Sequence, residues 1–353
     1  MNNELQLKNK KVRILGAGIS GLVAGITLAR NGFQVEIFEK RPRIGSFFEK
    51  TIHSLRNYYY DYDVIRKYRS LGIKISNIYP IFREFRFSPS LKKVEIYSKN
   101  KPLFYNFVRG YNSKKSFDFK LYETAKKLGV KLYFNKVINH KEVDIIATGA
   151  SSIGGIAYGE HYSEISGLAP NSVYIFLDNR YSPNGYSCIL PFNNEASIFI
   201  SSTKNESKDD LKKKFNLLKN NNPIIRKIIK NAKFKNEIFG FAFFDDPKTA
   251  IKNGKLYVGE SAGFLDAATG FGTHYAILSG YLAAIAIIEN KNYDDLWKET
   301  FEEEIKIHYL KRGKIQKFTN RDHEKIIDIL TKKYGGKLSA SEYKLFKLPL
   351  NQF

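Results

Sequence analysis

The chain has a single cysteine, Cys188, among its 353 residues, with one methionine and one tryptophan. A lone cysteine excludes a disulfide within the monomer and any cysteine-rich metal cluster. The six histidines are scattered and lack the close pairing typical of metal ligands, so no metal site is expected. The default expectation is therefore an intracellular, cytoplasmic protein.

Long apolar runs are also missing. The first ten residues are polar, which does not fit a secretory signal peptide. Residues 275–288 form the most apolar late stretch, but Ser279 and Gly280 interrupt it and it is too short to cross a bilayer. Any contact with a membrane is expected to be peripheral.

Acidic residues are few: 35 Asp and Glu stand against 58 Lys and Arg, which gives a net charge of +23. The lysines are spread along the whole chain. One interpretation is a lysine-rich proteome with solvated side chains. The other is a surface that meets polyanions such as an anionic membrane or a diphosphate substrate. No nucleic-acid-binding motif accompanies the charge, so nucleic acid is not an expected partner.

What the sequence does contain is a dinucleotide-binding fingerprint. The apolar strand pattern of residues 12–15 leads into Gly16, Gly18 and Gly21, which have the G-x-G-x-x-G spacing. Gly16 permits a tight turn, Gly18 lets the backbone approach a pyrophosphate, and Gly21 lets the following helix pack closely on the strand. The start of that helix then offers free N–H groups to the phosphates.

An acidic residue completes this motif. A second strand pattern at residues 35–38 leads to Glu39, eighteen residues after Gly21. A carboxylate there accepts hydrogen bonds from a ribose diol and repels a 2′-phosphate, which suits the AMP half of FAD or NAD rather than NADP. Lys40 and Arg41 follow directly and are expected at the nucleotide edge.

The rest of the chain alternates between two kinds of pattern. Short alternating runs at residues 82–108 predict strands. A helix that begins after Ser116 and two further strands then return the chain to the nucleotide-binding sheet, which closes with a turn at Gly149. Residues 156–247 have mostly the pattern of an antiparallel sheet.

The second informative stretch is KLYVGESAGFLDAATGFGTHYAILSGYLAA, residues 255–284. A strand ends at Gly259, and the carboxylate of Glu260 is then suited to hold a ribityl or ribose hydroxyl. For His274 the alternatives are an approach to the cofactor and a solvent-exposed or helix-capping position, of which the second is favoured. The loop before it lets the backbone lie against a flat ring, and we expect these residues beside the cofactor: Gly270, Phe271 and Gly272.

These segments resemble the geranylgeranyl reductase-like FAD oxidoreductases, within the wider group of p-hydroxybenzoate hydroxylase-type flavoproteins. Residues 258–284 are similar to the family segment whose acidic residue binds the FAD ribityl chain and whose glycines lie beside the isoalloxazine. The resemblance implies these roles for Glu260, Gly270 and Gly272. FVRG at residues 107–110 is similar to the segment that brings an arginine, here Arg109, to the FAD.

A further segment is similar to the family's P-x-x-Y-x-W-x-F-P substrate-cavity motif: Pro183, Tyr186, Cys188, Leu190 and Pro191. Cys188 stands where tryptophan is common and Leu190 where phenylalanine is common, so the identity of the substrate is open. Tyr186 and Cys188 alternate along a strand and point to one face. They are the candidate catalytic residues: Tyr186 donates a proton or positions a water molecule, and Cys188 mainly shapes the cavity.

The resemblance implies an α/β fold, in which a Rossmann-like FAD-binding domain is interleaved with an antiparallel β-sheet substrate domain and followed by a helical C-terminal part. The expected boundaries are 1–81, 109–155 and 248–292 for the FAD-binding domain, 82–108 for strands shared with the substrate domain, 156–247 for the substrate domain, and 293–353 for the C-terminal region.

The implied activity is that of an FAD-dependent enzyme that saturates carbon–carbon double bonds of an isoprenoid (geranylgeranyl) lipid or its precursor. The chain lacks a second dinucleotide fingerprint, so its electrons are expected from an external donor: a reduced nicotinamide, a deazaflavin or a ferredoxin. The alternatives are a flavin monooxygenase acting on a hydrophobic substrate and a non-catalytic prenyl-binding carrier.

Overall fold

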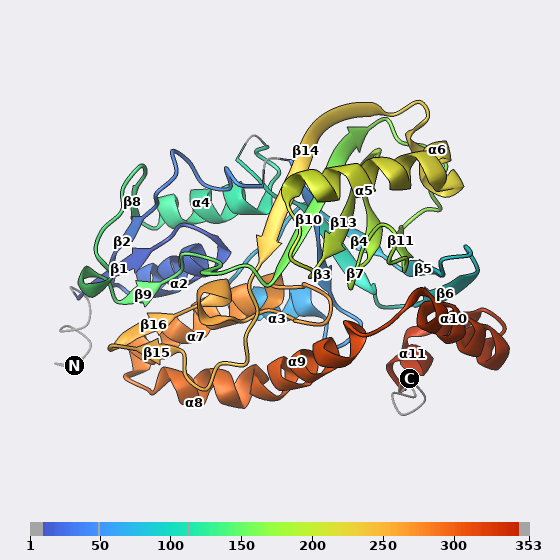
Figure 1. The fold of residues 1–353 in the computed structure, drawn as a ribbon. Helices are drawn as coiled ribbons and strands as arrows, with labels where there is room; N and C mark the ends of the chain where they lie inside the picture. Colours follow the sequence, from blue (N-terminus) through green and yellow to red (C-terminus); the bar gives the residue numbers. More distant parts are fainter. Residues whose placement is uncertain (1–9, 49, 112, 346–353) are drawn as a thin grey trace.

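The computed structural model describes residues 10–48, 50–111 and 113–345, and the chain builds three sheets with helices around them (Figure 1). The first sheet has six strands in the order β15 (Ile251–Lys252), β16 (Lys255–Tyr257), β9 (Ile145–Ile146), β1 (Lys11–Leu15), β2 (Gln34–Phe38) and β8 (Lys131–Tyr133). All neighbouring pairs are parallel except β15 and β16. This is the Rossmann-like sheet that the glycine motif predicts.

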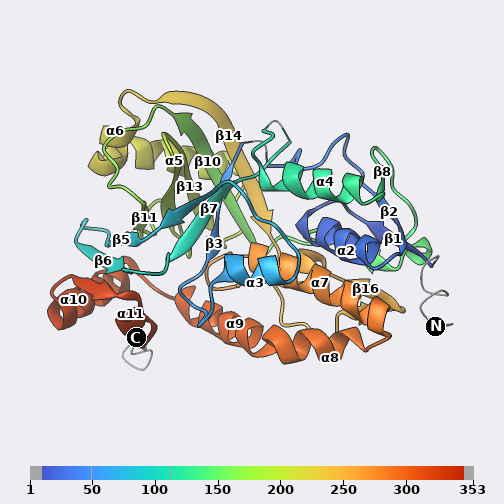
Figure 2. The same cartoon turned by 180° about the vertical axis from the view of Figure 1, so that it is seen from behind.

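Helix α2 (Ile19–Arg30) is buried along most of its length because other elements enclose it. It packs against β2, against α4 (Phe117–Lys127) and against α7 (Thr273–Glu289), and Figure 2 shows α4 beside it. The contact with α7 is close: a Cβ atom built on Gly280 would lie 2.3 Å from the carbonyl oxygen of Ser20. Small residues therefore set the distance between these two helices.

The second sheet has eight strands in the order β14 (Lys233–Ala242), β10 (Gly155–Ser163), β13 (Glu195–Ser202), β12 (Ser187–Phe192), β11 (Ser172–Phe176), β5 (Arg83–Phe87), β6 (Lys93–Tyr97) and β17 (Lys337–Ser339). It is antiparallel except where β11 meets β5 and β6 meets β17. Helices α5 (Lys208–Asn221) and α6 (Pro223–Ile229) cover one face (Figure 1). The two faces bury separate apolar clusters, so side chains alternate along β12 between them.

A small antiparallel sheet lies between the two larger ones. It has the order β3 (Ile52–Arg56), β7 (Phe104–Val108) and β4 (Ile78–Ile81), and α3 (Val64–Ser70) lies between β3 and β4 in the chain. It is tied to the eight-stranded sheet by the side chain of Asn106, which donates to the Pro191 carbonyl at 2.8 Å. Of the strands predicted within residues 82–108, β5 and β6 thus join the eight-stranded sheet, and β7 joins this small one.

The C-terminal region divides between the two large sheets. Helix α8 (Tyr293–Trp297) continues through a π-helical turn at Lys298–Glu302 into α9 (Glu303–Ile315), which runs beside α7. Helices α10 (Asn320–Tyr334) and α11 (Ala340–Leu345) pack instead at the edge of the eight-stranded sheet, where β17 pairs with β6.

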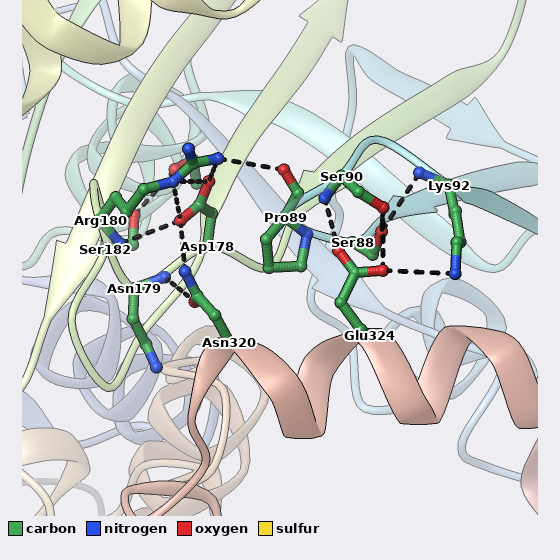
Figure 3. A network of polar contacts seen from close by, with 11 residues as sticks. Ser88, Pro89, Ser90, Lys92, Asp178, Asn179, Arg180, Ser182, Asn320 and Glu324 are labelled. Carbon is green, nitrogen blue, oxygen red and sulfur yellow. Dashed lines mark hydrogen bonds and ion pairs between the residues drawn. The ribbon is translucent and has the colours of Figure 1, made fainter.

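Two polar contacts attach α10 to loops of that sheet (Figure 3). The Asn320 amide donates to Asp178 at 3.1 Å, and the Ser90 hydroxyl donates to Glu324 at 2.9 Å. The predicted fold class, including the helical C-terminal part, is confirmed. Within the described part of the chain, none of the helices combines the length and apolar character that a bilayer span requires.

Candidate functional site

The three glycines of the fingerprint form the turn between β1 and α2, but they meet different surroundings. Gly16 has a φ of +107°, and a Cβ there would lie 2.2 Å from the Ala147 carbonyl oxygen. A Cβ on Gly21 would lie 2.0 Å from the Gly16 carbonyl oxygen. In contrast, no described atom lies within 4 Å of a Cβ built on Gly18. The fold itself therefore requires Gly16 and Gly21, whereas Gly18 borders open space.

That open space lies at the N-terminus of α2. Among the described residues no side chain caps this helix, and its first turn carries no acidic side chain. The free N–H groups and the positive end of the helix dipole therefore face the space beside Gly18. This arrangement fits a pyrophosphate.

Glu39 lies at the carboxyl end of β2, against the glycine turn. One of its carboxylate oxygens accepts a hydrogen bond from the Ala17 amide and the other from the Arg41 amide, both at 2.9 Å. The side chain is partly exposed, and a carboxylate has lone pairs for further donors such as ribose hydroxyls. Lys40 is exposed, and the Arg41 guanidinium lies 4.7 Å from the centre of the Phe47 ring.

The other predicted residues of this sheet meet at the same edge, because β16, β9, β1 and β2 are parallel neighbours. Gly149 follows β9 and has a φ of +79°, and a Cβ atom built on it would meet no described atom within 4 Å. Gly259 follows β16, and its amide donates to the Ser279 hydroxyl at 2.8 Å. A Cβ atom built on Gly259 would lie 3.0 Å from the Ser20 hydroxyl oxygen, so the backbone just before Glu260 packs against the first turn of α2.

Burial raises the pKa of Glu260 to about 7, although a backbone hydrogen bond from Phe243 and the charge of Arg109 both act in the opposite direction. A carboxyl group with such a pKa is shared between its acid and its anion near neutral pH. Glu260 can therefore accept a hydrogen bond from a polyol or donate one.

Arg109 is held by a buried partner. Its Nε and Nη2 atoms donate to Asp118 at 2.7 and 2.9 Å, and its guanidinium lies 4.5 Å from the centre of the Phe48 ring. The pKa of Asp118 is lowered by Arg109 against the effect of burial, so the pair is ionised. Arg109 thus contributes a fixed positive charge near Glu260.

The loop before α7 continues the site. Gly270 has a φ of +81° and borders open space in the described structure, and Gly272 is the residue before α7. Phe271 stacks on Phe104 with ring centres 5.8 Å apart and lies 4.6 Å from the Arg56 guanidinium. The loop therefore has an open backbone surface on one side and an aromatic contact with the small sheet on the other.

The segment from Pro183 to Pro191, which we call the proline-bounded motif, contacts this loop from the eight-stranded sheet. The Tyr186 hydroxyl donates to the Thr269 carbonyl at 2.6 Å. Cys188 and Leu190 are buried in one apolar cluster with Tyr186, Phe104 and Phe271, as their alternation predicts. Burial raises the pKa of both Tyr186 and Cys188, which makes each a weak acid.

The carbonyl groups of the two prolines that bound this motif accept hydrogen bonds from side chains. The Pro183 carbonyl accepts from the Ser202 hydroxyl at 3.1 Å, and the Pro191 carbonyl accepts from the Asn106 amide.

A buried ion pair near the loop was not anticipated from the sequence. Arg56, at the end of β3, pairs with Asp266, and both contact the Thr269 hydroxyl. Asp266 lies within residues 255–284, which the sequence already indicates as part of the site, but the residues around Arg56 have no periodic pattern that indicates a functional role. Only the meeting of β3 with the loop brings the two charges together.

The favoured expectation for His274, a solvent-exposed or helix-capping position, is wrong. Its side chain is buried, stacks on Tyr60 with ring centres 4.4 Å apart, and shares a 2.5 Å hydrogen bond with the Tyr68 hydroxyl. Burial lowers the pKa of His274 to about 3, so the ring is neutral. His274 also borders a small cavity at the start of α7, which we call the α7 cavity. Other residues that line it are Arg56, Tyr60, Asp266, Phe271, Thr273 and Tyr275.

Comparison with known proteins agrees with this fold. Residues 14–65 match the model of an NAD(P)-binding Rossmann-like domain. The digeranylgeranylglycerophospholipid reductase of Methanocaldococcus jannaschii is 25% identical over 95% of this chain and 93% of its own length. A geranylgeranyl bacteriochlorophyll reductase-like protein from Thermoplasma acidophilum superposes with a TM-score of 0.74 at 20% identity, over 92% of each chain.

The chain has the fold of the geranylgeranyl reductase-like flavoproteins. The resemblance predicted from the sequence is thereby confirmed. The myxobacterial halogenase CndH, described as an FAD-dependent halogenase, shares the fold with a TM-score of 0.63 at 13% identity, over 93% of this chain and 90% of its own. These comparisons support the predictions of an enzyme and of FAD as its cofactor. Protein MJ1520 of M. jannaschii is 31% identical over 45% of this chain, and this match spans only 42% of the length of that relative.

Two glycine substitutions should separate cofactor binding from folding. Gly18→Ala places a methyl group in open space, so the stability of the flavin-free protein should hardly change. The same methyl group lies where the phosphates of FAD are expected to approach the backbone. We expect FAD affinity to fall by about ten- to a hundredfold, the value of one or two lost charge-assisted hydrogen bonds. Gly21→Ala should instead destabilise the protein by about 1–3 kcal/mol through overpacking. Thermal unfolding and flavin fluorescence titration measure the two effects. Full FAD affinity in Gly18→Ala would place the phosphates elsewhere.

Glu260 should give the flavin-free protein a distinct pH dependence. Its folded pKa of about 7 lies above the ordinary value of 4.5, so between these pH values the folded state keeps a proton that the unfolded state releases. Buried neutral histidines such as His274 and His308 make the free energy of unfolding rise with pH in the same range. The contribution of Glu260 should instead fall as pH rises from about 4.5 to 7, by at most about 3 kcal/mol. Glu260→Gln should remove this slope in urea titrations, whereas Glu142→Gln, an exposed control, should keep it. Equal slopes in both variants would contradict the assignment.

Proposed function

We propose that this protein is an FAD-dependent reductase that saturates carbon–carbon double bonds of an isoprenoid lipid or its precursor. The observation that carries this proposal is the contact between Tyr186 and Thr269, which joins the proline-bounded motif to the Gly270–Gly272 loop. Apolar side chains, Cys188 and Leu190 among them, surround this meeting point. The similarity to a digeranylgeranylglycerophospholipid reductase over nearly the whole chain supports the same substrate class.

The residues present fit FAD. The open space at Gly18 and the uncapped start of α2 would hold the pyrophosphate, and Glu39 the adenosine ribose. Glu260 would bind the ribityl chain, and the exposed backbone at Gly270 would lie against the ring. When bound, reduced FAD supplies a hydride. Its electrons would come from an external donor: a reduced nicotinamide, a deazaflavin or a ferredoxin.

The chain's own task in this reaction is to position an alkene and to exclude water. An isolated alkene has no carbonyl group to polarise, so hydride delivery to one carbon must accompany protonation of the other in a dry site. Burial keeps the Cys188 thiol protonated, which suits it to shape the apolar wall. The hydrogen bond of Tyr186 to a backbone carbonyl fixes its ring at the boundary between loop and motif.

The proposal predicts a specific product. Chemically reduced protein, incubated without oxygen with a geranylgeranyl lipid, should oxidise its flavin and add one hydrogen molecule to the lipid per double bond reduced. Mass spectrometry of the lipid and flavin absorbance follow both events. Cys188→Ala should change the preferred length of the isoprenoid chain more than the rate of reduction, because loss of the sulfur atom enlarges the space beside the apolar wall. Tyr186→Phe should slow flavin reoxidation, because it loses the bond to Thr269.

Two outcomes would replace this function with one of its alternatives. If reduced flavin ignores prenyl substrates but uses oxygen to hydroxylate a hydrophobic compound, the protein is a monooxygenase. If the purified protein is colourless, binds no added FAD and still binds a geranylgeranyl lipid, it is a prenyl carrier.

We also propose that α6 meets an anionic membrane surface. Arg226, Lys227 and Lys230 are exposed on or beside this short helix, and Leu217 of the neighbouring α5 is 51% exposed. An open groove below α6 has an aromatic floor that includes Phe85 and Tyr174. Cationic side chains next to exposed apolar ones are suited to lipid headgroups and the chains beneath them.

Charge reversal should test this surface. Replacing Arg226, Lys227 and Lys230 by Glu should abolish cosedimentation with anionic vesicles, since each cation near the surface contributes about 1 kcal/mol. Lys126→Glu with Lys127→Glu, on α4, is the matched control and should bind like the unchanged protein. Binding of the unchanged protein should weaken as salt is raised. Equal binding to neutral and anionic vesicles would reject the electrostatic contact.

A further inference from the structure

The source of the proton is the open question of the proposed reaction. Tyr186 is the donor that the sequence suggests, but among the described contacts no carboxylate is hydrogen-bonded to it that could return a proton after it gives one away. The Tyr186 hydroxyl is also engaged with the Thr269 carbonyl. Each alkene that is reduced consumes a proton, which must reach a dry site from solvent. A second set of polar groups, at the α7 cavity, offers such a route.

Two tyrosine hydroxyls at this cavity share one carboxylate. Tyr275, in the first turn of α7, donates to Glu304 at 3.1 Å, and Tyr60, from the segment after β3, donates to the same oxygen at 3.4 Å. Both tyrosines line the α7 cavity, beside Phe271 and Thr273 of the loop region. Glu304 belongs to α9, which runs along α7 on the side away from the glycine turn (Figure 2).

The burial of these groups is graded. Tyr275 is only 2% exposed and Tyr60 9% exposed, whereas Glu304 is partly exposed. A proton from water can therefore reach the Glu304 carboxylate, but water has little access to the hydroxyls behind it. The three groups together form a path from the surface of α9 to the α7 cavity.

A second pair of residues fixes the orientation of Tyr275. His308, one turn after Glu304 on α9, has its Nδ1 atom 3.3 Å from the Tyr275 hydroxyl and 3.6 Å from Asp266. His308 is 2% exposed and burial lowers its pKa to about 4, so the ring is neutral at pH 7. A neutral imidazole can donate to Tyr275 through Nδ1–H and leave the tyrosine proton directed at Glu304. His308 is a positioning residue in this arrangement.

The electrostatics suit proton transfer. Burial raises the pKa of Glu304, so this carboxyl group holds a proton at higher pH than an exposed glutamate does. Burial also raises the pKa of Tyr275, which keeps the hydroxyl protonated. A hydroxyl that stays protonated transmits a proton by releasing one while it accepts another.

We propose that Glu304, with Tyr275 and Tyr60, is a proton relay that supplies the α7 cavity from solvent. This inference rests on the proposed reductase function for its final acceptor. In the reaction, the C=C π bond breaks, one carbon gains the hydride of reduced FAD and the other gains a proton. The tyrosine O–H bond supplies that proton, Glu304 returns one to the tyrosine, and water recharges Glu304. The electrons come from the reduced flavin alone, so the relay is not itself oxidised.

The test uses a matched pair of variants on one helix. Glu304→Gln keeps the size and hydrogen-bonding ability of the side chain but cannot exchange a proton with water. Glu303→Gln removes an exposed neighbouring carboxylate and is the control. We expect lipid reduction to slow by roughly a hundredfold in Glu304→Gln, the scale of general acid catalysis, and to be unchanged in the control. The double variant Tyr60→Phe with Tyr275→Phe should match Glu304→Gln.

Three further readouts separate a relay from a structural contact. FAD affinity and melting temperature should be retained in Glu304→Gln. Formic acid added to Glu304→Ala should restore part of the rate. In the flavin-free protein, the infrared difference between the unchanged chain and Glu304→Gln should contain a carboxyl band that changes from the anion to the acid at a higher pH than an exposed glutamate does. Equal lipid reduction rates in Glu304→Gln and Glu303→Gln, or no rescue by formic acid, would overturn the relay.

A measurement without lipid keeps the relay and the reductase function distinguishable. Anaerobic reduction of bound FAD by a one-electron reductant takes up protons, which a pH indicator follows in weak buffer. Uptake should be slower in Glu304→Gln than in Glu303→Gln even if no prenyl substrate is ever reduced. In that case the relay stands and the substrate assignment fails. Normal uptake and normal lipid reduction in Glu304→Gln would leave the reductase function intact and reject the relay.

Discussion

The close backbone packing around the start of α2 is the constraint on which the rest of the site depends. Gly21 lets α2 approach the turn after β1, Gly16 lets that turn approach Ala147 at the end of β9, and Gly280 lets α7 approach Ser20. A side chain at any of these positions would meet backbone atoms at 2.0–2.3 Å. Because no Cβ atom separates the backbones at these three contacts, the turn, α2 and α7 pack closely at the carboxyl ends of four parallel strands: β2, β1, β9 and β16.

The cofactor side and the substrate side of the molecule are joined at one loop. Thr269 accepts the Tyr186 hydroxyl through its carbonyl and contacts Asp266 and Arg56 through its own hydroxyl. Buried ions are costly unless they are paired, and two buried arginines near the site have a carboxylate partner, Asp266 for Arg56 and Asp118 for Arg109. A third, Arg312, donates to the Asn184 carbonyl at 2.9 Å. These pairs keep fixed charges close to an otherwise apolar region.

Much of the cofactor side was predictable because it depends on local chain geometry. The spacing of Gly16, Gly18 and Gly21 and the place of Glu39 follow from a strand, a turn and a helix that are consecutive in the sequence. Strand alternation predicts that Tyr186 and Cys188 point to one face, and both side chains contribute to the same apolar cluster. His274 was misjudged because a histidine after a glycine loop has no local signal for burial, which here comes from Tyr60 and Tyr68 of a distant segment.

The sequence by itself determined the nucleotide turn, the alternation of the proline-bounded strand and the order of the two kinds of sheet, because each arises from residues close together in the chain. Only the tertiary structure decided that β3 and β7 form a separate sheet, that Arg56 meets Asp266, and that Glu304 lies behind Tyr275. These pairs join residues that are 29 to 210 positions apart. Their meeting depends on how whole helices and sheets pack, which no periodicity within one segment encodes.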